Sequence, residues 1–332
     1  MVGLYFQKRR QNEKNFVHRC VAVTLSVAFC DSHLIADEFI ESINQKATTW
    51  TARKNFENYT TEQLKALAGV KGIYSDERNR LPRIVHNVQA DGIPDTFDSR
   101  EVWPECSSIG TIRNQGQCGS CWAFAAVEVM SDRLCIFSAG AKQFVFSPEE
   151  LVSCCTACGS GCDGGMLNEP FIYWTNHGIP SGGDEGSNYG CMPYTAGSTG
   201  VTPQCNERCL SNYDKSWSDD IRHGIAAFEV TTTVEQIQHE IMINGPVEAF
   251  MTVYQDFYNY GSGIYQYTEG SSVGGHAVKI LGWGTDNGIP YWLAANSWGT
   301  DFGENGFFRI LRGSNNVDIE SYVTAGNPNT DE

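Results

Sequence analysis

The spacing of hydrophobic positions changes along this chain and predicts different elements in different segments. Over residues 36–46 the apolar side chains Phe39, Ile40 and Ile43 share a face at helical spacing, which predicts an amphipathic helix. In the stretch TTEQLKALAG, Thr60 and Gln63 fit a capping box at the start of a second short helix, and Gly69 can end it. Helices this short need tertiary partners, so this segment is expected to dock on a larger body.

From residue 93 onward two further patterns follow each other. A long apolar stretch from about Ser120 to Ile136 predicts one buried helix. After about residue 214 the pattern favours strands, because YWLAANSW and GFFRILRG are rich in aromatic and β-branched residues and glycine-rich turns separate them. A mostly helical half, 93–213, beside a β-rich half, 214–332, predicts an α+β fold with a cleft between the halves.

The N-terminus has a basic region followed by the apolar run Val21–Phe29, which is typical of a signal peptide. Residues 1–36 are assigned to it, with cleavage between Phe29 and Ala36; the alternative is a buried helix or strand. The run is shorter than the roughly 20 residues that span a bilayer, so no stable membrane insertion is expected. A change of composition near Ile93 separates a segment, 37–92, from the main domain, 93–332.

Composition narrows the class of protein. A formal net charge of −16 argues against nucleic-acid binding, which needs a basic face. Of the 13 cysteines, all but Cys20 and Cys30 lie between residues 106 and 209. Such density indicates either disulfides in an oxidising compartment or a metal cluster in a reducing one. The signal peptide favours disulfides, so neither a metal nor a cofactor is expected.

One cysteine lies where a nucleophile is expected. In the string QGQCGSCWAF, Gly116 and Gly119 permit tight turns before the long helix, and Cys121 begins it. The dipole at a helix N-terminus lowers a thiol pKa and favours the nucleophilic thiolate. The Cys118–Cys121 spacing also fits redox or zinc chemistry. A redox motif would follow a strand in a βαβ unit, which is not evident, while zinc would need further ligands such as Cys154, Cys155, Cys158 and Cys162.

A thiol nucleophile needs a base and a group that orients the base. His276, in GGHAVKILGWG, is placed at the start of an apolar strand that faces the cleft. A lone histidine there is more often structural. Asn296, in NSWGTDFGENGFF, supplies a candidate orienting group, and Trp298 can shield their hydrogen bond from water.

The strings CGSCWAF, GGHAVKILGWG and NSWGTDFGENGFF resemble the three active-site blocks of papain-family cysteine peptidases. Further strings, among them TFDSREVWPEC, ELVSCC and GCDGG, resemble cathepsin B-like members, and the likeness runs from about Asp37 to Gly326. The resemblance implies a papain-like two-domain fold, with a mostly helical left domain, a β-barrel-like right domain and the active site between them. It also implies a zymogen in which residues 37–92 form an inhibitory prosegment.

The resemblance assigns roles residue by residue. Cys121 would attack the scissile carbonyl as a thiolate paired with His276, and Asn296 would orient the imidazole. Gln115 and the backbone N–H of Cys121 would form the oxyanion hole. The positions that match substrate-binding residues of the family are Gly119, Gly164, Gly165, Met166, Leu167, Phe250, Gly275, Ala277, Trp298 and Tyr322.

The same resemblance implies a disulfide pattern that leaves Cys121 unpaired. The implied pairs are Cys106–Cys135, Cys118–Cys162, Cys154–Cys205, Cys155–Cys158 and Cys191–Cys209. Protein and peptide substrates, the chain's own prosegment and cystatin-type inhibitors are the implied partners of a monomer. Its route is the secretory pathway, ending in a lysosome, a digestive vacuole or the extracellular space. Asn58 begins a glycosylation sequon.

Two departures from the cathepsin B pattern change the expected activity. Cathepsin B has an occluding loop with two histidines, whereas the corresponding stretch here, 191–205, is short and contains none. An endopeptidase with weak or absent carboxydipeptidase activity is therefore expected. Tyr322 stands where cathepsin B has an S2 glutamate, with Glu320 two residues earlier, so an aliphatic P2 preference is expected. The competing hypothesis is a non-catalytic binding protein of the family, which the presence of all four catalytic positions disfavours.

Overall fold

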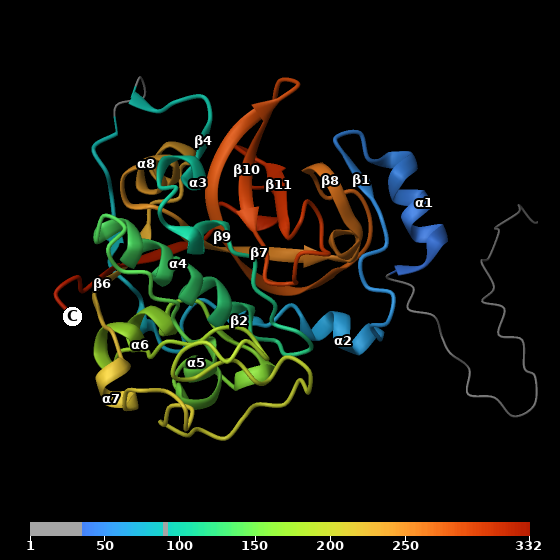
Figure 1. Ribbon diagram of the computed structural model, residues 1–332. Coiled ribbons are helices and arrows are strands. Elements are labelled where there is room, and N and C mark those ends of the chain that lie inside the picture. Colours follow the sequence, from blue (N-terminus) through green and yellow to red (C-terminus); the bar gives the residue numbers. More distant parts are fainter. Residues whose placement is uncertain (1–34, 89–91) are drawn as a thin grey trace, which may run out of the picture. The chain divides into compact units, whose positions relative to one another are not determined.

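The computed structural model describes residues 35–88 and 92–332, and the predicted signal peptide lies outside them apart from its last two residues (Figure 1). Both helices predicted before residue 93 are present, as α1 (Asp37–Lys46) and α2 (Thr61–Ala66). The capping box forms, with the N–H of Gln63 donating to Thr60 Oγ1 over 3.2 Å. Gly69, however, does not end α2, which stops three residues earlier.

The other elements follow in chain order. The predicted prosegment also contains β1 (Trp50–Ala52), β2 (Val70–Gly72), the 3-10 helix η2 (Glu77–Asn79) and β3 (Arg83–Ile84). Residues 93–213 contain β4 (Phe97–Asp98), α3 (Ser99–Val102), η4 (Ser107–Gly110), α4 (Cys121–Phe137), α5 (Pro148–Cys154), η5 (Gly161–Asp163), β5 (Gly165–Met166) and α6 (Glu169–His177). Residues 214–332 contain α7 (Trp217–Asp220), β6 (Gly224–Val230), α8 (Val234–Asn244), β7 (Val247–Tyr254), η6 (Gln255–Asn259), β8 (Tyr260–Tyr265), β9 (Ser272–Asp286), β10 (Ile289–Ala295), β11 (Phe307–Leu311), η7 (Asn316–Asp318) and β12 (Val323–Pro328).

The strands of the described residues form one hydrogen-bonded network in the order β1-β8-β11-β10-β9-β7-β12-β6-β3. Both end strands, β1 and β3, come from the predicted prosegment. The third prosegment strand, β2, pairs in parallel with β5 and antiparallel with β9. Residues 37–92 therefore add strands to the sheet at three separate places.

Helix α4 is the buried helix that the apolar stretch predicted. Its side chains from Cys121 to Cys135 are all buried, so it has no solvent-facing side over this length. It packs against β9 and β12 (Figure 1). Two of its buried charges are paired with neighbouring elements: Asp132 lies 2.8 Å from Lys279 Nζ of β9, and Arg133 lies 2.8 Å from Glu240 of α8.

Two short strands connect the two halves of the main domain. Strand β4, from the start of the helical half, pairs with β9 of the β-rich half. At the other end of the chain, β12 packs beside α4, and Gly326 lies so close to Trp174 of α6 that a Cβ there would come within 3.1 Å of the ring. Strand β4 therefore joins the halves by strand pairing, and β12 joins them by packing against α4 and α6.

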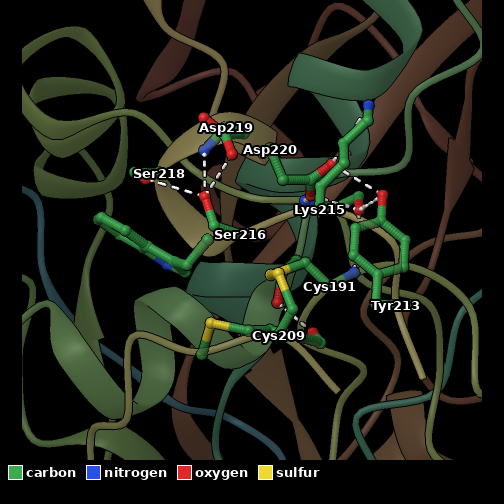
Figure 2. The surroundings of a disulfide bond; sticks show 12 residues. Cys191, Cys209, Tyr213, Lys215, Ser216, Ser218, Asp219 and Asp220 are labelled. Atoms are coloured by element: carbon green, nitrogen blue, oxygen red, sulfur yellow. Dashed lines mark hydrogen bonds and ion pairs between the residues drawn. A yellow bond between two sulfur atoms is a disulfide. The ribbon is translucent and has the colours of Figure 1, made fainter. Parts of the chain in front are cut away.

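The structure contains the five disulfides that the resemblance implied, and Cys121 is the free cysteine of the described residues. Figure 2 shows the surroundings of Cys191–Cys209, where the Tyr213 hydroxyl donates to Asp220 Oδ1 over 2.7 Å. Asp220 is buried, and its other oxygen accepts from the backbone and hydroxyl of Ser181. This network holds the end of the loop that the disulfide closes. Within residues 35–88 and 92–332, no helix combines the length and apolar character needed to cross a membrane.

Candidate active site

Cys121 is the first residue of α4 and is fully buried. The turn before it is held by hydrogen bonds from Gln115 N–H to Ser297 O, 2.9 Å, and from Gly119 N–H to Cys162 O, 2.9 Å. Gly116 has a φ of +62°, and a Cβ on Gly119 would lie 2.6 Å from the Cys162 carbonyl oxygen. Both glycines are therefore required by the turn that presents Cys121.

His276 lies on β9 and Asn296 directly follows β10, its antiparallel neighbour. The ring nitrogen His276 Nε2 lies 2.8 Å from Asn296 Oδ1, which also accepts the Ser297 N–H over 2.8 Å. Because Oδ1 is an acceptor, Nε2 carries the proton, and Nδ1 of the neutral ring remains available as a base. The Trp298 ring lies 4.8 Å from the imidazole and covers it from water.

The side-chain amide of Gln115 is oriented by a residue that sequence reasoning did not single out. Ser297 Oγ donates to Gln115 Oε1 over 2.8 Å, so Gln115 Nε2 is the atom that faces the cleft. This Nε2 donates to the carbonyl oxygens of Cys118, 2.8 Å, and Leu67, 3.2 Å. A carbonyl oxygen of the predicted prosegment thus occupies the donor that was assigned to the oxyanion hole.

Tyr194 is a second residue that sequence reasoning missed. Its hydroxyl donates to Gln115 O over 3.0 Å and lies 2.9 Å from Ser120 Oγ. It comes from the short loop 191–205 and is buried behind the turn that precedes Cys121. The motif strings gave no signal for this contact, because it joins residues more than 70 positions apart.

The predicted prosegment lies directly on the nucleophile. Gly69 N–H donates to Cys121 Sγ over 3.3 Å, and Gly69 O accepts from Gly165 N–H over 2.9 Å. Further along β2, Leu167 N–H donates to Gly72 O over 3.1 Å, and Val70 pairs with Gly275. Gly165 and Gly275, which were expected to bind an extended substrate, therefore contact residues 69–72 of the chain itself.

Apolar side chains surround this segment on the side of the expected S2 pocket. Val70 belongs to one buried cluster with Leu167 and Ala277, against which Phe250 packs. The ring of Tyr322, 39% exposed, meets Phe250 edge-on at 6.4 Å between centroids. A Cβ on Gly72 would lie 3.1 Å from the Met166 sulfur, so Met166 borders the same segment.

On the other side of Cys121 the prosegment covers Trp298. The Phe56 ring meets it edge-on at 5.6 Å, whereas Tyr258 of η6, in the main domain, stacks on it at 5.5 Å. Gln63 Nε2 also donates to Gln117 Oε1 over 2.7 Å. Residues of the prosegment therefore cover both sides of the cleft.

Ionisation of the catalytic pair differs from the expectation for a bare helix N-terminus. Burial raises the pKa of the Cys121 thiol to about 11, although the backbone N–H groups of Ala277, Gly69 and Trp122 oppose the rise. Burial also lowers the pKa of His276 to about 4. Thiol and imidazole are both neutral around pH 7 while residues 66–72 cover them.

The zinc and redox alternatives required cysteines that the structure pairs elsewhere. Cys118 is bonded to Cys162, so it forms no disulfide with Cys121. The other candidate zinc ligands are likewise in disulfides, Cys154–Cys205 and Cys155–Cys158. Over the described ranges no group of three or more His, Cys, Asp or Glu side chains is arranged to hold a metal ion.

A buried thiol at a helix N-terminus, a histidine oriented by an asparagine and a peptide segment across both define a cysteine protease in its covered form. The chain belongs to the papain family of cysteine proteases, whose family model matches residues 93–327. A second model, the peptidase family C1 propeptide, matches residues 35–72. The protein is a peptide-bond hydrolase made as a zymogen, with its own prosegment as inhibitor.

Within that family its relatives are cathepsin B-like. It is 46% identical over 301 residues to "Cathepsin B-like cysteine proteinase 3" of Caenorhabditis elegans, covering 86% of this chain and 81% of the relative. "Cathepsin B-like cysteine proteinase 5" of the same organism is 44% identical over 319 residues, covering 89% and 91%. The solved "proCathepsin B S9 from Trypanosoma congolense" has a TM-score of 0.79 at 34% identity, covering 90% of this chain and 99% of that one. Cathepsin-like proteases of this family typically pass through the secretory pathway.

Proposed function

We propose that the mature domain is an endopeptidase that works through a Cys121–His276 pair. Cys121 gives its proton to His276 Nδ1 and attacks the scissile carbonyl carbon, forming a tetrahedral oxyanion. Gln115 Nε2 and the Cys121 N–H donate to that oxygen. The intermediate collapses to a thioester as His276 protonates the leaving amine, and water, with His276 as base, then releases the acid.

The observation that carries this mechanism is the position of the Leu67 carbonyl oxygen. It lies 3.2 Å from Gln115 Nε2, two residues before the amide that touches Cys121 Sγ. A peptide carbonyl therefore reaches the oxyanion donor while the chain lies on the sulfur. Removal of one such donor lowers kcat by about 10²–10³ in enzymes of this kind.

The prosegment occupies the same groups without being cut. Next to Sγ it presents the N–H of Gly69, so the sulfur accepts a hydrogen bond instead of meeting a carbonyl carbon. The neutral thiol under this cover is also a weak nucleophile. Inhibition thus combines occupation of the cleft with suppression of the thiolate.

The position of the loop 191–205 supports endopeptidase action, because hydrogen bonds hold this loop against the segments that contain Gln117 and Cys162. Gln117 N–H donates to Gly197 O over 2.7 Å, and Cys162 N–H donates to Thr202 Oγ1 over 2.8 Å. The loop contains no lysine, arginine or histidine, so it offers no cationic side chain for a substrate's C-terminal carboxylate. We infer little carboxydipeptidase activity.

An aliphatic P2 preference is supported by the prosegment's own side chain in that region. Val70 packs in one cluster with Leu167 and Ala277. The nearby carboxylate of Glu320 accepts hydrogen bonds from Trp292 Nε1 over 2.8 Å and from Gly313 N–H over 2.6 Å. Because these donors engage the Glu320 carboxylate, we infer that Glu320 does not favour arginine at P2. We also infer that the mature enzyme is a monomer and that cystatin-type inhibitors bind it. Its final location would be a lysosome, a digestive vacuole or the extracellular space.

The test uses the acid-matured enzyme and matched peptides that differ in two features. One feature is the C-terminus, free acid or amide; the other is the P2 residue, Val, Leu or Arg. We expect kcat/KM to be equal within about threefold for acid and amide. Val and Leu should exceed Arg by at least tenfold, about 1.4 kcal/mol.

The Cys121→Ala variant, which lacks the nucleophile, controls for contaminating peptidases. A strong preference for the free acid would show that the enzyme is a carboxydipeptidase. Arginine as the best P2 residue would show that the S2 assignment is wrong.

A further inference from the structure

A cavity of about 380 Å³ lies outside the catalytic cleft, between α4 and the loops of the helical half. None of the cleft residues lines it, and the prosegment contributes nothing to its wall. The wall combines charged, hydroxyl and aromatic side chains, among them Ser108, Arg113, Glu128, Phe144, Asp184 and Tyr189. The established reaction uses none of these residues.

The side chain of Glu128 is the unusual feature of this wall. It lies on α4, is 5% exposed, and its Oε1 has no hydrogen-bond partner in the described part of the chain. Its other oxygen lies 3.7 Å from Lys279 Nζ, beyond hydrogen-bond distance. Buried carboxylates are costly unless a donor or a cation reaches them.

The charges around Glu128 leave one negative charge uncompensated. Lys279 of β9 lies 2.8 Å from Asp132 of α4, so this one cation serves two carboxylates. Arg113 pairs with Asp184 over 2.6 Å, and its other nitrogens donate to the carbonyl oxygens of Phe146 and Gly182. Neither basic side chain has a donor left that is within hydrogen-bond distance of Glu128 Oε1.

The remaining part of the wall is suited to the hydrocarbon portion of a ligand. Phe144 and Val145 line the cavity, and the 46% exposed Tyr189 belongs to both the wall and the surface. Aromatic faces also attract cations, by about 0.5–1 kcal/mol at exposed sites. A volume of about 380 Å³ holds a small flexible ligand as well as its cationic head.

We propose that this cavity binds an organic monocation, a guanidinium or primary ammonium on a short apolar stem, whose head pairs with Glu128 Oε1. The source is either a free amine or the side chain of a basic residue in a peptide. A metal ion does not fit, because among the residues described no three acidic, histidine or cysteine side chains converge there. The site is open in the zymogen, since the prosegment does not line it.

The charge of Glu128 gives the site a pH dependence. Burial raises the pKa of Glu128 to about 7, Lys279 and Arg113 oppose the rise, and Asp132 and Asp184 add to it. A bound cation favours the ionised carboxylate. Affinity is therefore nearly full at pH 8 and above, and it falls as the pH drops and Glu128 takes up a proton, by about 100-fold at pH 5.

Isothermal titration of the full-length Cys121→Ala zymogen, which cannot process itself, tests the proposal. Agmatine represents the free amine, N-acetyl-arginine methylamide represents the peptide side chain, and N-acetyl-citrulline methylamide is the neutral isostere. We expect at least one of the two cations to bind at pH 8, with the citrulline compound at least tenfold weaker. Which cation binds more tightly identifies the source.

Two variants locate the binding. Glu128→Gln should abolish it, and Glu101→Gln, an exposed acid outside the cavity, should leave it unchanged. Equal affinity for the arginine and citrulline compounds, or no binding of either cation at millimolar concentration, overturns the proposal. If the Glu128→Gln variant fails to fold, the comparison of the arginine and citrulline compounds on the protein with an intact cavity still tests the proposal.

Discussion

Glu320 and Tyr322 lie close in sequence, just before β12, and have different roles. Its carboxylate accepts from Trp292 Nε1 and from the N–H groups of Gly313 and Asn315, each within 2.8 Å. Tyr322, two residues on, is partly exposed beside Phe250 instead. The carboxylate therefore stabilises a turn, and the tyrosine borders the pocket.

The Glu320→Ala variant should lose stability and keep its specificity. Three donors would be left without their acceptor, at about 1–3 kcal/mol each when buried. We expect a fall in Tm of several degrees, measured by calorimetry, and an unchanged P2 profile. Glu101→Ala, on the surface, is the matched control. A changed P2 profile at unchanged Tm would place Glu320 in the pocket.

The ionisation of Cys121 should depend on the prosegment. Because its pKa is raised to about 11 under cover, the zymogen thiol stays protonated across the neutral range and ionises only in strong alkali. Removal of the cover removes the burial that raises the pKa, so the mature enzyme should form thiolate at a much lower pH. Ultraviolet absorbance of the thiolate, as a difference from Cys121→Ala, measures both forms. Coincident titration curves would contradict this cause.

At the scale of elements, strand β2 depends on one residue without a side chain. A Cβ on Gly69 would lie 1.9 Å from the Gly119 carbonyl oxygen, a contact that backbone on both sides cannot relax. We expect Gly69→Ala to displace β2 and expose Cys121. The unprocessed zymogen at neutral pH should then react at least tenfold faster with an epoxide thiol inhibitor.

Gly92→Ala is the control for this experiment, since nothing lies within 4 Å of a Cβ at that position. Its zymogen should react as slowly as the parent chain. Equal protection of Cys121 in the Gly69→Ala zymogen would mean that segments other than β2 cover the nucleophile.

The elements also show which local signals suffice. Helix α2 followed from its capping box and α4 from its long apolar run, because helix caps and burial leave marks in nearby residues. Strands β1 to β3 have only two or three residues each, too few for an alternating pattern to show. Their positions are set by the sheet edges that accept them.

For the molecule as a whole, the prosegment shares the core of the β-rich half. Ile43, Trp50, Phe56 and Leu64 belong to the same buried cluster as Trp298. Removal of the prosegment exposes the partners of these side chains and leaves the ends of the sheet unpaired. The zymogen should therefore be the more stable form.

Calorimetry of the Cys121→Ala zymogen before and after removal of residues 1–92 by an added protease measures this difference. We expect the Tm to fall by at least several degrees on removal, with a smaller heat of unfolding. A Tm that stays constant would mean that the prosegment is held by the cleft alone.

The family resemblance implied the two-domain fold and the catalytic trio at Cys121, His276 and Asn296, because these positions lie in continuous motifs. It did not reveal that β4 pairs with β9, that β12 packs against α4, or that Ser297 supports Gln115. Contacts of this kind join segments far apart in sequence. Nothing in the residues around either partner marks them.

All five disulfides lie between residues 106 and 209, so the cleft wall that carries Cys121 is crosslinked and the wall that carries His276 is not. A thiol reductant that restores an oxidised Cys121 also attacks those crosslinks. Cys118–Cys162 joins the turn that precedes Cys121 to the segment that contains Gly164 and Gly165, and it lies next to the nucleophile. Activity should therefore be highest at an intermediate concentration of reductant. Too little reductant leaves the Cys121 sulfur oxidised, and too much breaks the disulfides of the cleft wall that carries Cys121.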